Sequence, residues 1–215
     1  MAATDGDLTQ AGERIVRFIG TRMTSYGPVY FDSVQLRSLG IGDVGTSVSI
    51  HTTCILVGLE NMRIGSNVRI DPFCTLIAAE GSIEIGSYVH IGGYSFLSGG
   101  EGIRIEDFAG LSQGVRVYSR SDDYSGETLT NPMVPERYRK VTKGPVRLDR
   151  HVIVGSGSVI LPGVTVGEGT AIGAMSLVRK SLDPWGVYFG VPARRLRDRS
   201  KDLLEMERLF RQDDP

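Results

Sequence analysis

The stretch Leu148–Val178, LDRHVIVGSGSVILPGVTVGEGTAIGAMSLV, carries an aliphatic residue at every sixth position. These positions are Leu148, Val154, Ile160, Val166, Ile172 and Val178. A period of six fits neither the helical period of about 3.6 residues nor the strand period of about 2. The stretch therefore predicts short strands that alternate with corners, which is the pattern of a solenoid.

The same hexads recur upstream in blocks that begin at Val44, Ile64, Ile85 and Ile105. The block starts are 20, 21 and 20 residues apart, so each coil holds three hexads and two or three further residues. A β-sandwich would instead show period-2 alternation with turn signals roughly every 8–12 residues. We therefore predict an all-β solenoid of triangular coils over residues 41–178, in which each coil buries its aliphatic ring by stacking on the next.

The composition sets limits on partners and location. Lys and Arg total 24 against 25 Asp and Glu, so the net charge is -1 and no nucleic-acid partner is expected. No apolar run approaches the roughly 18 residues of a membrane span, and the start MAATDGDLTQ lacks signal-peptide character. We therefore expect a cytoplasmic protein without a membrane span. Cys54 and Cys74 each precede a hexad aliphatic residue by two positions, which indicates buried thiols and no metal site.

Three segments fall outside the hexads. Residues 1–40 form an N-terminal capping segment, in which apolar residues at helical spacing predict a helix from Leu8 to Thr24. Residues 118–145 form a long inserted loop, and its tyrosines among charged residues favour a functional role. Residues 179–215 form a C-terminal tail, which ends in a short predicted helix with Ser200 as its N-cap.

Two motifs connect the chain to a known family: VGSGSVILPGVTVG, which starts at Val154, and GVPAR, which starts at Gly190. With these motifs, residues 44–197 resemble the hexapeptide-repeat acyltransferases of the sugar O- and N-acetyltransferase type. The resemblance implies a left-handed parallel β-helix and a homotrimer that binds acetyl-CoA between adjacent subunits. It also implies acetyl transfer to a hydroxyl or amino group of a sugar or nucleotide-linked amino sugar, in the synthesis of surface polysaccharide precursors.

The resemblance also suggests which residues contact CoA. Small residues allow the pantetheine arm to lie against a coil, and basic residues reach phosphate groups. The positions that match the family's CoA contacts are Ser156, Ala174, Lys180, Arg194 and Arg197.

The catalytic base departs from the family pattern. The O-acetyltransferases place a general-base histidine in the long loop, but this loop has no histidine, and the matching place falls near Asp122. His90 precedes the inward-facing Ile91, so its side chain should point outward, and we expect it to act as the base with Asp122 or Asp123 as its partner. An amine acceptor would need less help from a base than a hydroxyl would, because positioning supplies much of the rate.

Two other functions fit the hexads. A zinc carbonic anhydrase of the same fold needs a closely spaced histidine pair, whereas His51, His90 and His151 are 39 and 61 residues apart. A non-catalytic assembly module would need neither the long loop nor the basic tail. Acyl transfer from acetyl-CoA is therefore the function that the sequence favours.

Overall fold

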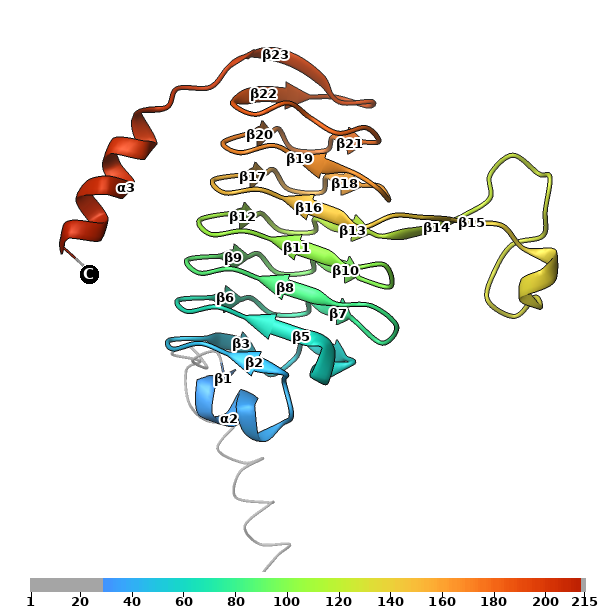
Figure 1. The fold of residues 1–215 in the computed structure, drawn as a ribbon, viewed down its shortest axis with the longest axis horizontal. Coiled ribbons are helices and arrows are strands. Elements are labelled where there is room, and N and C mark those ends of the chain that lie inside the picture. The colour runs from blue at the N-terminus through green and yellow to red at the C-terminus, as the bar shows by residue number, and fades with distance from the viewer. Residues whose placement is uncertain (1–28, 214–215) are drawn as a thin grey trace, which may run out of the picture.

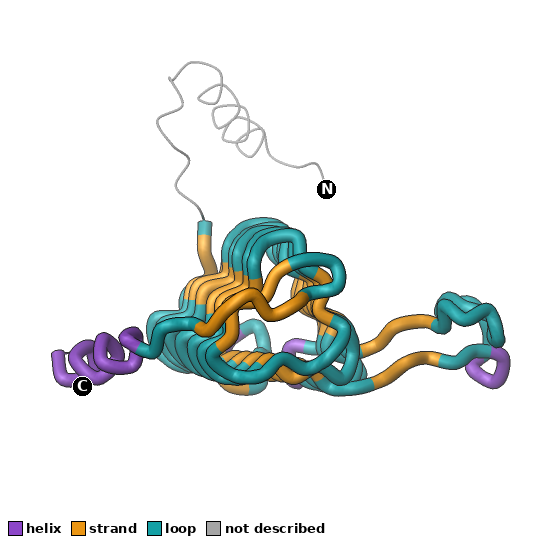
Figure 2. The backbone as a smooth tube through the Cα atoms, turned by 90° about the horizontal axis from the view of Figure 1, so that it is seen from above, coloured by secondary structure: helices purple, strands orange, loops and turns teal. Residues whose placement is uncertain are grey.

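The computed structural model describes residues 29–213, most of which form one stack of triangular coils (Figure 1). The predicted helix from Leu8 to Thr24 lies outside the described residues. Seen from above in Figure 2, the coils superimpose, so that each side of the triangle is a sheet in which the strands of successive coils run parallel. The fold is thus the solenoid that the hexads predict.

Each coil passes in turn through three sheets, named here sheets B, A and C. Sheet B contains β2 (Asp43–Val44), β5 (Met62–Ile64), β8 (Ile83–Ile85), β11 (Ile103–Ile105), β16 (Val146–Leu148) and β19 (Thr165–Val166). Sheet A contains β1 (Tyr30–Phe31), β3 (Ser49–His51), β6 (Arg69–Ile70), β9 (His90–Ile91), β12 (Gly110–Leu111), β17 (Ile153–Val154), β20 (Ala171–Ile172), β22 (Gly186–Phe189) and β23 (Arg194–Asp198). Sheet C contains β4 (Ile55–Val57), β7 (Thr75–Ile77), β10 (Phe96–Ser98), β13 (Arg116–Tyr118), β18 (Val159–Ile160) and β21 (Leu177–Val178).

The register of the sheets stacks each hexad aliphatic residue on its counterpart in the next coil. In sheet A, for example, Ile70 pairs with Ile91, which belongs to the same column as Leu111 and Val154. These side chains are at most 1% exposed, so the columns form one continuous core. Stacking of coils therefore buries the rings that a single coil would leave in water.

The stack continues beyond the predicted end at Val178. Leu182 forms a bridge to Val166, and β22 adds a parallel strand to β20, so a partial further coil covers the sixth. Tyr188 takes the place of an aliphatic residue in the sheet A column and is 6% exposed. The hexad pattern did not predict this coil because its core residue is an aromatic one.

The first coil is covered by the segment that precedes it. Helix α2 (Ser33–Ser38) begins with a capping box, in which the Asp32 carboxylate accepts hydrogen bonds from the Gln35 and Val34 backbone amides. Its Leu36 is fully buried in the core. Strand β1 pairs antiparallel with β3 and also protects the edge of sheet A.

The inserted loop and the C-terminal helix leave the stack in different directions (Figure 1). Strands β14 (Arg120–Asp122) and β15 (Val141–Lys143) form an antiparallel arm that carries the 3₁₀ turn η2 (Glu136–Tyr138) beyond it. A second 3₁₀ turn, η1 (Leu59–Asn61), lies between the first and second coils. Helix α3 (Asp202–Asp213) follows Ser200, whose hydroxyl accepts from the Asp202 amide at 3.1 Å. Within residues 29–213, no helix is long and apolar enough to cross a membrane.

Candidate active site

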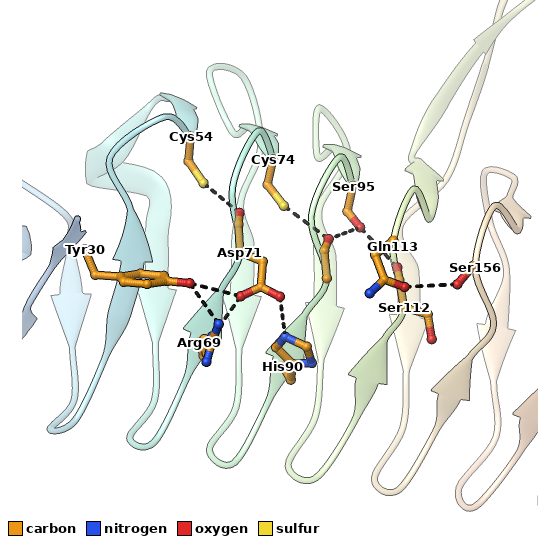
Figure 3. A network of polar contacts seen from close by, with 11 residues as sticks. Tyr30, Cys54, Arg69, Asp71, Cys74, His90, Ser95, Ser112, Gln113 and Ser156 are labelled. Carbon is orange, nitrogen blue, oxygen red and sulfur yellow. Dashed lines mark hydrogen bonds and ion pairs between the residues drawn. The ribbon is translucent and has the colours of Figure 1, made fainter. Parts of the chain in front are cut away.

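His90 lies on the outward face of sheet A, as the hexad register predicts, and its imidazole is 53% exposed. Its Nε2 donates a hydrogen bond to Asp71 Oδ2 at 2.8 Å (Figure 3). The other carboxylate oxygen accepts from Arg69 Nε at 2.8 Å and from the Tyr30 hydroxyl at 3.2 Å. The structure therefore gives His90 a carboxylate partner, Asp71, in place of the Asp122 or Asp123 that the sequence analysis expected.

The electrostatics of this cluster keep Asp71 ionised. Partial burial of Asp71 opposes ionisation, but hydrogen bonds from His90 and Arg69 outweigh it and hold the pKa of the carboxyl below its ordinary value. Burial is also the main reason why the pKa of the Tyr30 phenol is raised, so this hydroxyl stays a proton donor. An ionised carboxylate only accepts hydrogen bonds, so it fixes the proton of His90 on Nε2 and leaves Nδ1 as the acceptor.

Asp122 and Asp123, the expected partners of His90, lie on the arm and contact neither nitrogen of His90 within the described part of one subunit. Asp122 pairs with Val141 across the arm and lines a cleft with Arg139 and Lys143. Asp123 instead accepts from the Ser125 amide at 2.8 Å and from Thr128, and these hydrogen bonds lower the pKa of its carboxyl to about 2. Asp123 is thus a turn-forming residue and a poor base, whereas the Asp122 carboxylate accepts no such hydrogen bond from the part of the chain that the structure describes.

The corner between sheets A and C, named the AC corner, brings together two of the expected CoA contacts. Ser156 and Ala174 occupy the same position of successive coils, since the Met175 amide donates to the Ser156 carbonyl at 2.8 Å. The Ser156 hydroxyl also donates to the side-chain carbonyl of Gln113 in the preceding coil at 3.2 Å (Figure 3). A polar group at this corner therefore includes Gln113, which the sequence analysis did not single out.

The three basic candidates lie near the last coils. Arg194 and Arg197 both lie on β23. Arg194 pairs with Phe189 at the end of β22 that adjoins the AC corner, and Arg197 pairs with Val187, further from that corner. Lys180 follows β21 at the next corner of the triangle, between sheets C and B. All three side chains are exposed, so they are able to meet phosphate groups, but a single subunit does not gather them into one site.

A column of residues with left-handed backbone runs along the AC corner. We name it the AC ladder: it comprises Phe73, Tyr94, Gly114, Gly157 and Met175, whose φ values are between 57° and 69°. From Tyr94 onward, the backbone amide of each rung donates a hydrogen bond to a backbone carbonyl of the previous coil. The carbonyl is that of the residue just before the corresponding rung, and these bonds hold the rungs in register. The rings of Phe73 and Tyr94 stack with centroids 5.0 Å apart.

A second column, the BA ladder, runs along the corner between sheets B and A. Its rungs are Ser47, Asn67, Tyr88, Phe108, His151, Gly169 and Trp185, and all have positive φ. Tyr88 stacks on Phe108 at 4.9 Å, and Phe108 stacks on His151 at 5.2 Å. Phe210 of helix α3 packs edge-on against Tyr88 at 5.1 Å, so the helix covers this ladder.

The other two histidines have structural contacts. His151 is 7% exposed, and its Nε2 bonds to Glu207 of helix α3 at 2.7 Å, which ties the helix to the coil. His51 contacts the hydroxyl of its neighbour Thr53 at 2.8 Å. Between residues 29 and 213, no group of three or more His, Cys, Asp or Glu side chains has the arrangement of a metal site. Both cysteines are free thiols; Cys74 is buried as predicted, whereas Cys54 is half-buried.

Asp71 and the ladders could have been found in the sequence. Asp71 is the first residue after Ile70, at the end of β6. Because β6 pairs with β9 of the next coil, Asp71 lies beside the strand that carries His90. Tyr88 and Phe108 are 20 residues apart and Phe73 and Tyr94 are 21 apart, which are the lengths of a coil. The missed signal was this longer period, which the six-residue pattern obscured.

Comparisons with known proteins place the chain in a family. No protein-family model matches the chain. However, it is 42% identical over 182 residues to dTDP-4-amino-4,6-dideoxy-D-glucose acyltransferase of Escherichia coli, across 85% of this chain and 95% of that protein. The crystal structure of AntD, an N-acyltransferase from Bacillus cereus in complex with dTDP and 3-hydroxybutyryl-CoA, superposes with a TM-score of 0.84 at 41% identity, covering 87% of this chain and 98% of that one.

A maltose O-acetyltransferase from Clostridium difficile shares the fold at a TM-score of 0.52 and 21% identity, with coverage of 92% of this chain and 90% of that one. The much higher similarity to AntD and to the Escherichia coli enzyme extends over nearly their whole length. The protein therefore belongs to the hexapeptide-repeat β-helix acyltransferases, in the branch that contains these two nucleotide-amino-sugar enzymes.

Proposed function

We propose that the protein transfers the acyl group of an acyl-CoA to the amino group of dTDP-4-amino-4,6-dideoxyglucose. The observation that carries this proposal is the 42% identity to an acyltransferase of that amino sugar across 95% of its length. A further AntD structure, at 40% identity, holds this sugar nucleotide together with coenzyme A. The amide product fits the expectation that an amine acceptor makes fewer demands on the base.

The chemistry requires one proton to leave the acceptor. The amine nitrogen attacks the thioester carbonyl carbon, the C–N bond forms, the C–S bond breaks, and CoA leaves as the thiol after it gains a proton. His90 is suited to remove the amine proton, because Asp71 fixes its tautomer and leaves Nδ1 as the acceptor. Asp71 is then a positioning residue, while Arg69 and Tyr30 hold the carboxylate in place.

A sequence spacing in AntD supports a second pair of residues. AntD has been crystallised as variants in which one serine or one aspartate is replaced, and these two residues are ten positions apart in its sequence. In this chain, an aspartate follows a serine by ten positions at Ser33 and at Ser112. The Ser33 hydroxyl accepts from the Val48 amide under the first coil, which is a structural contact. We therefore assign Ser112 and Asp122 to the reaction site, with Asp122 as a second proton acceptor.

Ser112 and Asp122 lie on different parts of one subunit, which supports a site shared between subunits of a homotrimer. Ser112 is at the AC corner, whereas Asp122 is on the arm that projects away from the coils (Figures 1 and 3). The arm of one subunit would bring Asp122 to the AC corner of the next. Sheet C offers an apolar face for such contacts, which includes Ile55, 59% exposed, and Val57, 41% exposed.

For the donor, we propose that CoA binds along the AC corner of the later coils. Ser156 and Ala174 form a low surface there, and Arg194 lies at the adjoining end of β22. Lys180 and Arg197 would meet phosphates of CoA held by two adjacent subunits. AntD was crystallised with 3-hydroxybutyryl-CoA, so the assay compares acetyl-CoA with a hydroxyacyl-CoA as the acyl donor.

The test supplies dTDP-4-amino-4,6-dideoxyglucose with acetyl-CoA or 3-hydroxybutyryl-CoA and follows both free thiol and the mass of the nucleotide sugar. We expect the sugar nucleotide to gain one acyl group for each thiol released. Wild-type protein that binds neither CoA nor dTDP would contradict the proposal and favour a non-catalytic assembly module. The dTDP sugar that bears a 4-hydroxyl in place of the amine is the control acceptor, and we expect no transfer to it.

The role of His90 is tested in the same assay. We expect His90→Ala to lower kcat by about 100-fold, because it removes the base, and to leave CoA binding unchanged. Asp71→Asn should lower kcat with little change in KM, since it misorients the imidazole without removing a substrate contact. Arg63→Ala, which removes an exposed side chain from β5 of sheet B and away from His90 on sheet A, is the control and should keep its activity. Normal turnover by His90→Ala would assign the proton to Asp122.

A further inference from the structure

The AC ladder has one rung without a side chain and with space for one. A Cβ atom added at Gly114 would meet no atom nearer than 3.9 Å, and the nearest would be backbone of Gly157. The next rung is occupied, because a Cβ at Gly157 would meet the sulfur of Met175 at 2.5 Å. The space over Gly114 is therefore a slot between the ring of Tyr94 and the thioether of Met175.

The walls of this slot suit a flat ring. Phe73 and Tyr94 stack at 5.0 Å with an angle of 25° between their planes, so a ring on the next rung would stack on Tyr94 with the same spacing. The outer side of Tyr94 is uncovered, since its side chain is 66% exposed, and Met175 is 70% exposed. A sulfur contact on the opposite face adds favourable interaction with an aromatic ring.

The rim of the slot is polar. Gln113 directly precedes Gly114, and its side-chain carbonyl accepts from the Ser156 hydroxyl at 3.2 Å. This bond orients the amide so that its NH₂ group is available to donate to an acceptor at the edge of a bound ring. An aliphatic acyl chain would not use these donors, whereas a heterocycle with carbonyl or ring-nitrogen acceptors would.

We infer that the slot over Gly114 binds a nucleobase, stacked on Tyr94 and recognised at its edge by Gln113. The inference rests on the proposed function, in which both substrates contain a nucleotide: thymine in the dTDP sugar and adenine in CoA. Either base has a flat face for Tyr94 and acceptors for Gln113. The slot is one rung thick, so it holds a base from one of the two substrates.

The decisive variant is Gly114→Tyr, which fills the slot with the ring of the protein itself. The backbone accepts a side chain there, because Phe73 and Tyr94 have φ values of 61° and 62° against 68° at Gly114. Calorimetric titration with dTDP and with CoA should show affinity for one of them weakened by about tenfold or more, which is the loss expected for one stacked base. The ligand that loses affinity is the one whose base occupies the slot.

Two further variants make the result interpretable. Gly40→Tyr adds the same side chain at a glycine with positive φ and open space beside helix α2, and it should bind both ligands normally. Tyr94→Ala removes the stacking face without filling the slot, and it should weaken binding of the same ligand. Tyr94→Ala decides the question if Gly114→Tyr does not fold.

The outcomes distinguish failure of the proposed function from failure of the slot as a nucleobase site. Wild-type protein that binds neither dTDP nor CoA overturns the proposed function and this inference with it. If the wild type binds both, unchanged affinities in Gly114→Tyr and Tyr94→Ala overturn the slot alone. When each ligand is titrated with the other present at saturation, an equal loss of both in folded Gly114→Tyr also counts against the slot, because one slot cannot hold two bases at once.

Discussion

The two aromatic corners of the solenoid have the same backbone but different contents. On the BA ladder, rings continue from Tyr88 through Phe108 to His151, and the empty rung at Gly169 is filled by the indole of Trp185. On the AC ladder, the rings end at Tyr94 and the next rung is open. The comparison shows that stacked aromatic residues cover a corner of the coils. A gap in such a stack, as at Gly114, leaves one rung uncovered.

The cover over the two ladders differs as well. Helix α3 places Phe210 against Tyr88 and joins Glu207 to His151, so the chain itself completes the BA corner. No helix or strand among residues 29–213 covers Tyr94 in this way, and more than half of its side chain is exposed. The BA ladder therefore stabilises the fold, whereas the AC ladder offers an aromatic face to a ligand.

The largest expected effect comes from the same substitution at the two glycine rungs. Gly169→Tyr should destabilise the protein by about 3 kcal/mol or more, because its Cβ would lie 2.4 Å from the Trp185 ring and overpack the rung. Gly114→Tyr should leave the melting temperature unchanged or slightly higher, since it adds a ring to an open stack. Thermal unfolding followed by circular dichroism measures both.

The double variant Gly169→Tyr with Trp185→Ala is the control for this comparison. Removal of the indole should restore much of the lost stability, because the new ring then takes its place on the rung. If Gly114→Tyr proves as unstable as Gly169→Tyr, the AC rung is not open and the distinction between the corners is wrong.

The fold was predictable because its core repeats in the sequence. Leu148, Val154 and Ile160 differ in position by six, and this spacing alone assigns them to three different sheets of one coil. The last coil escaped prediction because Tyr188 occupies an aliphatic position. The covering helix α2 escaped it because Asp32 and Gln35 form a capping box without any repeat to mark them.

The second expected effect concerns the cover of the BA ladder. Glu207 is 11% exposed and accepts from Arg150, His151 and Arg211, which are the charged groups that face it. Glu207→Ala should weaken the docking of helix α3 by about 1–3 kcal/mol, because it leaves His151 buried without a partner. Hydrogen exchange should report faster exchange in the helix while amides of the coils stay protected.

Acidification should produce the same release in the wild-type protein. Although burial opposes ionisation of Glu207, hydrogen bonds from Arg211 and His151 hold its pKa below the ordinary value. A lowered folded-state pKa means that the ionised carboxylate stabilises the docked helix above roughly pH 4.3 and that this contribution is lost as the pH falls through the folded-state pKa. Helix α3 should show no such transition in Glu207→Ala. In the wild type, a helix whose protection stays the same throughout an acid titration down to the unfolding of the coils would contradict this role.

The candidate site was less predictable than the fold, because its contacts join residues from different coils. The outward direction of His90 followed from the inward position of Ile91, but its bond to Asp71 spans 19 residues. Asp123 attracted attention as a loop carboxylate, yet its bonds to Ser125 and Thr128 are local turn contacts. Residue type and spacing therefore identify candidates, whereas their partners depend on which coil corners lie side by side.

The smallest expected effect is that of a substitution at Phe73, which lies at the end of the AC ladder and away from its open rung. Phe73→Leu removes the ring that supports the far face of Tyr94 and should cost about 0.5–1 kcal/mol of stability, because its side chain is already 52% exposed. Nucleotide affinity should fall by less than in Tyr94→Ala, since Phe73 is one rung away from the slot. Denaturant unfolding and titration with dTDP and CoA test the two parts separately. A loss of affinity equal to that of Tyr94→Ala would show that the stacked pair, and not the open rung, determines binding.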